Sequence, residues 1–130
     1  MLSNAIISNA EVIDRYAFYG CDGLTSVVFG KNLKLINSYA FSSEKNLSTV
    51  TFNDCSAYIS DYAFHYCRSL EHVDFGSNVT YIGQYAFDNT KLSSVELPST
   101  LTYIGQYAFS NTNLTAVYIS DLSAWCNITF

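Results

Sequence analysis

Two histidines and four cysteines are the residues of this 130-residue chain best suited to a zinc site or to a cysteine nucleophile with its base. Three of them lie close together in the sequence, at His65, Cys67 and His72. Cysteine and histidine at short spacing are common ligands of Zn²⁺, and a cysteine beside a histidine can form a nucleophile with its general base. Both chemistries require the side chains to converge on one point, so the elements that carry these residues decide whether either is feasible.

The elements follow from a phrase that the chain repeats five times. The phrase Ile-x-x-Tyr-Ala-Phe begins at Ile13, Ile36, Ile59, Ile82 and Ile104, and the starts are separated by 23, 23, 23 and 22 residues. A fixed period in this range is typical of a solenoid, in which each repeat forms one coil and contacts only its neighbours. We expect this phrase to form a compact turn, with phenylalanine in the core and alanine allowing close approach of the backbone.

A second phrase, Leu-x-x-Val-x-(Phe/Leu/Ile), follows each turn and begins at Leu24, Leu47, Leu70, Leu92 and Leu114. Its alternation of apolar and polar positions predicts a short strand with one buried face. The spacing from the phenylalanine of the turn to this leucine is six residues in the first three repeats and five in the last two, as expected of a surface loop. The sequence therefore predicts a right-handed solenoid with short parallel strands on one face and irregular, short helical or extended turns on the other.

This architecture separates the three clustered residues. Cys67 is expected to point inward, His65 into the turn and His72 outward from the strand. The divergence argues against a metal site and against a Cys67–His72 catalytic pair. We therefore expect no catalytic residues, no metal and no cofactor.

The four cysteines are predicted to be free. Cys21 and Cys67 occupy equivalent positions two repeats apart, so their Cα atoms should lie about 10 Å from each other, beyond the reach of a disulfide. Cys55 lies on the opposite turn of its coil and Cys126 in the last residues of the chain. We expect all four to be buried thiols that fill small gaps in the core.

The outward-facing strand residues are the candidate binding site. Stacking places them in two columns, which are Ser26, Thr49, His72, Ser94 and Ala116, and Val28, Thr51, Asp74, Glu96 and Tyr118. Solenoids commonly bind ligands on such a sheet face, and aromatic anchors are common in interface hot spots. The residues predicted to contact a partner are Thr51, His72, Asp74, Ser94, Glu96 and Tyr118. The alternative is a solvated sheet face with no partner.

A column of tyrosines on the turns is a second candidate surface, consisting of Tyr16, Tyr39, Tyr62, Tyr85 and Tyr107. A structural role is favoured, because each ring lies beside the Ala-Phe pair of its turn and can pack along the coil while its hydroxyl stays hydrated.

Both ends of a solenoid need protection, because terminal coils expose core and unpaired strand edges. Residues 1–12 are expected to form an incomplete first coil, residues 13–119 five repeats, and residues 120–130 a C-terminal cap-like segment of the same single domain. The first coil has two possible alignments with the first repeat. In one, Ile6 aligns with Phe29; in the other, shifted by one residue, Leu2, Ala5 and Ile7 align with the Leu, Val and Phe of the strand phrase. The edge of this coil is a candidate for self-association. At the other end, Ile128 and Phe130 alternate around Thr129 and could form a last strand over the core, beside Trp125.

Composition narrows the possible functions. With 49% hydrophobic and 13% charged residues, the chain is typical of a packed domain rather than a disordered one. The net charge of −5 disfavours binding to nucleic acid or to anionic membranes. There is no run of eighteen apolar residues to span a membrane, and the first residues lack the features of a signal peptide. We therefore expect either a cytoplasmic protein or a piece of a longer exported one.

The two phrases resemble the BspA-type leucine-rich repeat. The segment 95–109 matches the pattern of that repeat almost position by position, and Cys21 and Cys67 fall on its cysteine. Glu44, Thr90 and Thr112 replace that cysteine in the other repeats, and the segment 121–130 is similar to one that interrupts such arrays in bacterial members. The resemblance implies a leucine-rich-repeat solenoid from a family of secreted or surface-attached proteins of bacteria and some protists, associated with adhesion to host matrix proteins and other cells, and without catalytic residues.

The predicted function is accordingly non-catalytic protein–protein binding in a surface adhesion or host-interaction protein, with a host matrix or cell-surface protein as the partner. An alternative is an intracellular acidic protein that masks a basic surface of its partner and inhibits it, which the charge, the free thiols and the missing signal peptide favour. A third is a structural spacer that binds nothing.

Overall fold

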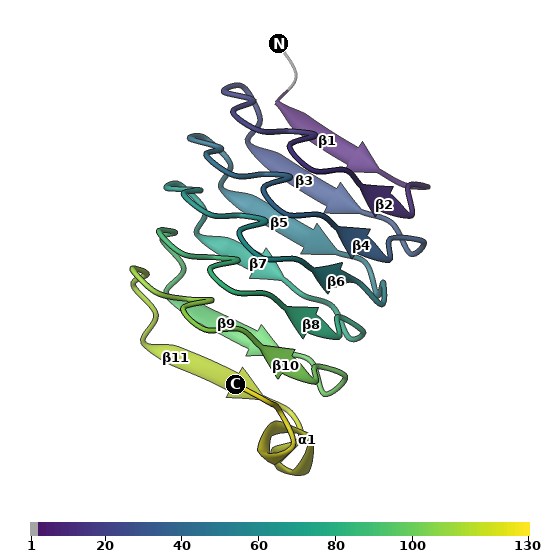
Figure 1. Ribbon diagram of the computed structural model, residues 1–130, viewed down its shortest axis with the longest axis vertical. Coiled ribbons are helices and arrows are strands. Elements are labelled where there is room, and N and C mark those ends of the chain that lie inside the picture. Colours follow the sequence, from purple (N-terminus) through teal and green to yellow (C-terminus); the bar gives the residue numbers. More distant parts are fainter. Residues whose placement is uncertain (1–2) are drawn as a thin grey trace.

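A computed structural model describes residues 3–130 as one solenoid in which each coil carries a long strand, a short strand and a compact turn (Figure 1). The long strands are β1 (Asn4–Ile7), β3 (Ser26–Phe29), β5 (Thr49–Phe52), β7 (His72–Asp74), β9 (Ser94–Leu97) and β11 (Ala116–Ile119). The short strands are β2 (Val12–Ile13), β4 (Leu35–Ile36), β6 (Tyr58–Ile59), β8 (Tyr81–Ile82) and β10 (Tyr103–Ile104). They form two walls of the molecule, the long-strand wall and the short-strand wall.

Equivalent residues of successive coils lie side by side. β3 and β5 pair in parallel, with Val27 opposite Val50 and Phe29 opposite Phe52. The short strands pair in the same way, for example with Ile59 opposite Ile82. The parallel solenoid predicted from the repeat is therefore confirmed.

The first coil follows the second of the two possible alignments. Ala5 lies opposite Val27 and Ile7 opposite Phe29, whereas Ile6 points outward and is highly exposed. Leu2, the remaining residue of that alignment, lies outside the described residues.

The long-strand wall has one discontinuity. The short strands pair without interruption from β2 to β10, but the long strands form a sheet of β1, β3, β5 and β7 and a separate sheet of β9 and β11. Within residues 3–130, no strand pairing joins β7 to β9, and Val73 of β7 is only half-buried, unlike Val27, Val50 and Val95 in the other strands. The discontinuity coincides with the first repeat whose loop is one residue shorter, between Phe87 and Leu92.

Each turn is closed by two residues in the left-handed region, four positions apart. The first is always the tyrosine of the repeated phrase, with φ between 55° and 63° at Tyr16, Tyr39, Tyr62, Tyr85 and Tyr107. The second has φ between 51° and 67° and is Gly20, Ser43, Tyr66, Asn89 or Asn111. Left-handed backbone is unfavourable for residues with a Cβ atom, so contacts with neighbouring coils must compensate. The Phe64 N–H, for example, donates to the Ala86 carbonyl of the next turn at 2.8 Å.

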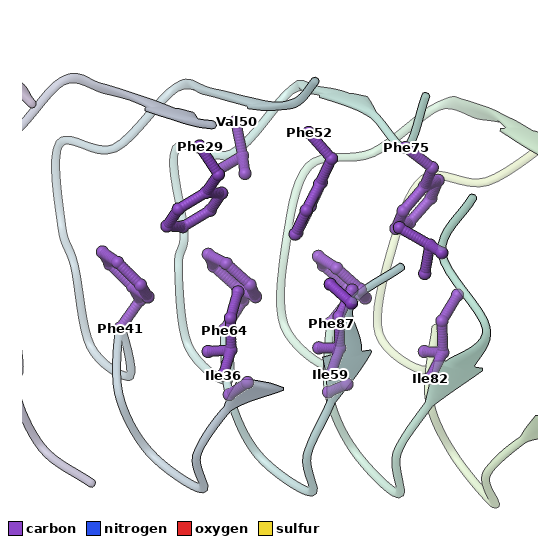
Figure 2. Close-up of a cluster of buried hydrophobic side chains, with 14 of the residues drawn as sticks. Phe29, Ile36, Phe41, Val50, Phe52, Ile59, Phe64, Phe75, Ile82 and Phe87 are labelled. Atoms are coloured by element: carbon purple, nitrogen blue, oxygen red, sulfur yellow. The ribbon is translucent and has the colours of Figure 1, made fainter. Parts of the chain in front are cut away.

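Phenylalanines form the centre of the core. Phe41, Phe64 and Phe87 stack along the axis with ring centroids 5.1 and 5.2 Å apart (Figure 2). A second column from the long strands, including Phe29 and Phe75, meets the first edge to face. Burying one such side chain stabilises the fold by about 1.5–3 kcal/mol, and the edge-to-face contacts join the turns to the long-strand wall.

The C-terminal segment differs from the expected last strand. Residues Leu122–Cys126 form the helix α1, which Asp121 caps by accepting a hydrogen bond from the Ala124 N–H at 3.0 Å. After the helix, only Thr129 pairs with a neighbouring coil, opposite Tyr103 of the short-strand wall. The sequence reasoning missed this helix because five residues are too few to show a helical period. No helix in residues 3–130 has the length and hydrophobicity needed to cross a bilayer.

The segment covers the core only in part. Trp125 and Ile128 pack against it, but Phe130 is 69% exposed. Val117 of β11 is 44% exposed, although the equivalent valines Val27, Val50 and Val95 of other long strands are buried. The long-strand side of the last coil therefore remains accessible.

Candidate functional site

The six candidate residues all lie on the outer face of the long-strand wall. Thr51 lies opposite Asp74, and Tyr118 opposite Glu96. In the other column, His72 lies opposite Thr49 and Ser94 opposite Ala116. Thr51 is half-buried, and the other five residues are exposed. The two columns predicted from the sequence therefore exist, but the discontinuity between β7 and β9 divides each of them.

A hollow of about 400 Å³ lies beside that discontinuity. Asp74 lines it from β7 and Glu96 from β9, so the structure brings these two predicted residues together. Its other lining residues are Asp54, Val73, Phe75, Gly76 and Ser77. His72, Ser94, Thr51 and Tyr118 lie outside the hollow. We name it the acidic hollow for its three carboxylates.

Two of these carboxylates are held in place by the loops that follow β5 and β7. Asp54 accepts hydrogen bonds from the Ser77 N–H at 3.2 Å and the Ser77 hydroxyl at 2.8 Å. Asp74 accepts from the Gly76 N–H at 2.9 Å. None of the three carboxylates forms a salt bridge within the described residues. The hollow thus presents three carboxylates without a paired cation among the described residues, two of them fixed by hydrogen bonds, which suits a cationic group.

Asp54 was missed by the sequence reasoning. It has left-handed φ of 52° in the loop after β5, one coil before Asp74, and it lines the hollow from that loop. The shortened loop was visible in the sequence, but its effect on strand pairing was not.

The histidine and cysteine cluster does not converge. The Cys67 side chain is buried, and its thiol donates to the Phe41 carbonyl at 3.0 Å. His72 is exposed on the long-strand wall. No group of three or more His, Cys, Asp or Glu side chains among residues 3–130 is arranged to hold a metal ion.

His65 has a different partner, Asp88 of the next coil, whose carboxylate lies 3.1 Å from its Nε2. Burial lowers the pKa of His65, and the nearby Asp88 opposes that shift. Burial disfavours ionisation of Asp88, but hydrogen bonds from Ser110, Asn111 and Asn89 outweigh it and hold the pKa of this carboxyl below its usual value.

Ser42, His65 and Asp88 occupy one column and have the composition of a hydrolase triad. Their geometry does not support that chemistry, because a nucleophile must bond its base and reach a substrate. The Ser42 hydroxyl is buried and donates instead to the backbone carbonyl of His65 at 3.1 Å. The column therefore links successive turns.

The four cysteines, all in the described part of the chain, are free thiols. The prediction that all are buried is wrong for Cys21 and Cys126, which are exposed in the first turn and at the end of α1. Burial raises the pKa of the Cys67 and Cys55 thiols, which makes them poor nucleophiles.

The tyrosines of the turns form a continuous stack, with neighbouring centroids 5.0–5.3 Å apart from Tyr16 to Tyr107. Stacking in register was expected from the repeat. A second ladder was not expected: Tyr58, Tyr81 and Tyr103 stack on the short-strand wall at 3.8 and 4.5 Å. A hydrogen bond with Tyr58 and burial raise the pKa of Tyr81 to about 12. Since both ladders are occupied by intramolecular stacking, their rings serve the fold.

Comparison with known families and structures agrees with this architecture. The model of the BspA type leucine rich repeat region matches in six copies over residues 3–129. No curated protein matches the chain.

Three solved structures are similar. A leucine rich cell surface protein from Faecalibacterium prausnitzii A2-165 is 28% identical, with a TM-score of 0.67 over 94% of this chain and 40% of that protein. A leucine-rich repeat protein from Bacteroides ovatus ATCC 8483 is 21% identical, with a TM-score of 0.73 over 88% of this chain and 33% of that protein. A leucine-rich repeat protein from Eubacterium ventriosum ATCC 27560 is 23% identical, with a TM-score of 0.64 over 88% of this chain and 33% of that protein. This chain thus spans between one third and two fifths of their length.

Leucine-rich repeat solenoids generally bind other proteins through an extended sheet face. The repeated phrases, the stacked coils and the family match over residues 3–129 together show that the chain belongs to the BspA-type leucine-rich repeat family.

Proposed function

We propose that this chain is a non-catalytic protein-binding module whose contact surface is the outer face of the long-strand wall, centred on the acidic hollow. The observation that carries the proposal is the meeting of Asp54, Asp74 and Glu96 in one hollow of about 400 Å³ without a compensating cation among residues 3–130. A carboxylate cluster of this kind attracts a basic side chain of a partner and speeds association.

The neighbouring residues extend the contact surface. Tyr118 lies opposite Glu96 and is 61% exposed, so its ring is available as an aromatic anchor beside the charged hollow. His72, Thr51 and Ser94 supply polar contacts around it. The partner is therefore a protein that presents a lysine or arginine with an adjacent apolar patch.

Display on a cell surface, with a host matrix or cell-surface protein as partner, is the setting that we favour. Support comes from the similarity to the Faecalibacterium protein, which is described as a leucine rich cell surface protein. The six Lys and Arg residues against eleven Asp and Glu residues make nucleic acid an unsuitable partner.

A binding assay on immobilised matrix proteins tests the proposal. The triple variant Asp74→Ala, Glu96→Ala, Tyr118→Ala should lose most of the binding that the unmodified chain shows. A matched control, Glu11→Ala, Asp14→Ala, Tyr19→Ala, removes the same residue types from exposed positions elsewhere and should bind normally. Equal binding by the triple variant and the unmodified chain would remove this surface from consideration.

The acidic hollow and the free thiols also favour a second candidate, an intracellular protein that masks a basic surface of its partner. Contacts dominated by charge weaken strongly with salt. A loss of affinity of about tenfold or more between 50 and 300 mM salt would identify charge, rather than Tyr118 and apolar contacts, as the main contribution to binding. Both candidates use the acidic hollow, so salt-sensitive binding to an intracellular basic protein without binding to immobilised matrix proteins would favour this second candidate.

Self-association through the first coil is a further proposal. β1 pairs only with β3 within residues 3–130, and its free edge can pair with another strand. Light scattering that gives the monomer mass over a hundredfold concentration range would count against it.

A further inference from the structure

A second hollow of about 400 Å³ lies on the loops that join the turns to the long strands. Its lining residues are Ser43 and Lys45 of one coil and Tyr66 and Arg68 of the next. Both loops belong to the repeats with the six-residue spacing. None of these residues belongs to the acidic hollow.

The loop backbone directs these four side chains outward. In each loop the residue between the two lining residues, Glu44 or Cys67, is buried in the core. Ser43 and Tyr66 take left-handed φ of 64° and 61°, which reverses the chain on one side of the buried residue. The walls of the hollow are therefore fixed by the core beneath them.

The hollow concentrates positive charge in an acidic protein. Lys45 and Arg68 are two of only six basic residues in a chain with a net charge of −5. Arg68 forms no salt bridge within residues 3–130, and its guanidinium lies 5.1 Å from the centroid of the Tyr66 ring, which restrains it. Lys45 lies 3.8 Å from the carboxylate of Asp22, which does not line the hollow, and both side chains are mostly exposed, so this pair is weak.

We propose that this hollow binds a carboxylate side chain on an acidic segment of a partner protein. The planar guanidinium of Arg68 matches a carboxylate with two parallel hydrogen bonds, while Lys45 adds a point charge and the Ser43 hydroxyl a donor. The Tyr66 ring offers apolar contact to the methylene groups of the incoming side chain. A phosphate is a poorer fit, because its second negative charge would be repelled more strongly by Asp22, whose carboxylate lies 3.8 Å from Lys45. This site is distinct from the acidic hollow and takes a ligand of the opposite charge.

Nuclear magnetic resonance titration of the ¹⁵N-labelled chain tests the inference. The probe is the capped peptide acetyl-Gly-Glu-Glu-Gly-amide, and the isosteric control is acetyl-Gly-Gln-Gln-Gly-amide. We expect saturable shifts at Ser43, Lys45, Tyr66 and Arg68 with the glutamate peptide and none with the control. Arg68→Ala should weaken binding about tenfold or more, and Arg68→Lys should weaken it less.

Two further variants sharpen the test. Asp22→Asn removes the carboxylate that pairs with Lys45 and should strengthen binding severalfold. Lys34→Ala is the matched control, because Lys34 is also an exposed lysine paired with a carboxylate, 3.4 Å from Glu11, and it should leave binding unchanged.

An unchanged affinity in Arg68→Ala, with native circular dichroism, would overturn the site. Tighter saturable binding of glucuronate or inorganic phosphate than of the glutamate peptide would overturn the assignment of a peptide ligand. Either result leaves the acidic hollow untouched, because the two hollows share no residue.

Discussion

The first three coils and the last two differ by one residue in the loop that follows each turn. This difference accompanies a change in the residues that the loops place in the core and on the surface. The longer loops place Cys21, Glu44 and Cys67 at the position after the second left-handed residue, whereas the shorter loops place Thr90 and Thr112 there. Each threonine hydroxyl donates to the phenylalanine carbonyl three residues earlier, at 3.0 and 2.9 Å. The hollow at Lys45 and Arg68 lies on the longer loops.

The acidic hollow lies where the two types of coil meet. The short-strand wall is continuous across this boundary, while the long-strand wall is interrupted between β7 and β9. We attribute the interruption to the shortened loop, which leads directly into β9. A regular solenoid thus acquires binding surfaces through irregularity in its loops, while its turns and core stay uniform.

The largest expected effect concerns Glu44, the acidic residue that the longer loops carry into the core. Burial raises its pKa from 4.5 to about 7, although the Cys21 N–H donates to Oε1 at 2.7 Å. Its Oε2 is buried and has no hydrogen-bond partner among the described residues. Between pH 4.5 and 7 the folded chain keeps a proton on this carboxyl that the unfolded chain has lost. The contribution of Glu44 to stability is therefore greatest below pH 4.5 and is lost as pH rises from 4.5 through 7.

Urea denaturation of Glu44→Gln across pH 4.5–8 checks this sign. The variant should lack this pH dependence and, at pH 8, have a free energy of unfolding higher by on the order of 3 kcal/mol. Glu11→Gln, at an exposed position, is the control and should follow the unmodified chain. If the free energy of unfolding of Glu44→Gln and of the unmodified chain changed with pH in parallel, the raised pKa of Glu44 would be contradicted.

A smaller effect is expected on the short-strand wall, where the last two coils carry Gly83 and Gly105 and the coil before them carries Ser60. A Cβ atom at Gly83 would lie 2.5 Å from the backbone nitrogen of Asp61. Gly83→Ala should therefore lower the free energy of unfolding by about 1–3 kcal/mol. Ser60→Ala should change it by about 0.5 kcal/mol or less. If thermal denaturation gave equal losses of stability for Gly83→Ala and Ser60→Ala, the backbones of neighbouring coils would not be closer at Gly83 than at Ser60.

Restoring the missing residue should remove the interruption itself. A glycine inserted between Thr90 and Lys91 gives the fourth repeat the six-residue spacing. Lengthening the loop by one residue lowers the free energy of unfolding by only about a few tenths of a kcal/mol. We expect pairing of β7 with β9, about tenfold slower amide exchange in β9, and weaker binding at the acidic hollow. Unchanged exchange in β9 would show that strand sequence, rather than loop length, separates the two sheets.

The smallest effect separates stacking from backbone strain in the turns. Tyr62 stacks on Tyr39 and Tyr85, each at 5.0 Å, whereas Tyr107 stacks only on Tyr85 within the described residues. Tyr62→Ala should therefore destabilise more than Tyr107→Ala. At either position the glycine variant should be more stable than the alanine variant by about 1 kcal/mol, because glycine tolerates left-handed φ. Equal stability of the two variants at Tyr62 would deny that this residue is strained.

The regular part of the fold was predictable because its signal is repeated. Five copies of each phrase place Val27 opposite Val50 and Phe29 opposite Phe52 without knowledge of any contact. The outward columns of the long-strand wall follow from the same period, and so does the tyrosine stack on the turns.

The irregular part was not predictable from periodicity. The left-handed φ of Tyr62 carries no local signal, since glycine is the residue that usually marks such a conformation. The exposure of Cys21 and Cys126 depends on how the ends of the solenoid are covered. Of the acidic hollow, Asp74 and Glu96 were found because they share a column, and Asp54 was missed because it lies in a loop.

The paired left-handed positions of each turn have a consequence for how the array assembles. A coil standing alone would keep the strain of its tyrosine and lose the ring of the next coil that compensates for it. Ordering should therefore start from any two adjacent coils and propagate along the array. A copy added by gene duplication would bring with it the stacking partner that the previous terminal coil lacked, which makes lengthening of such arrays energetically easy.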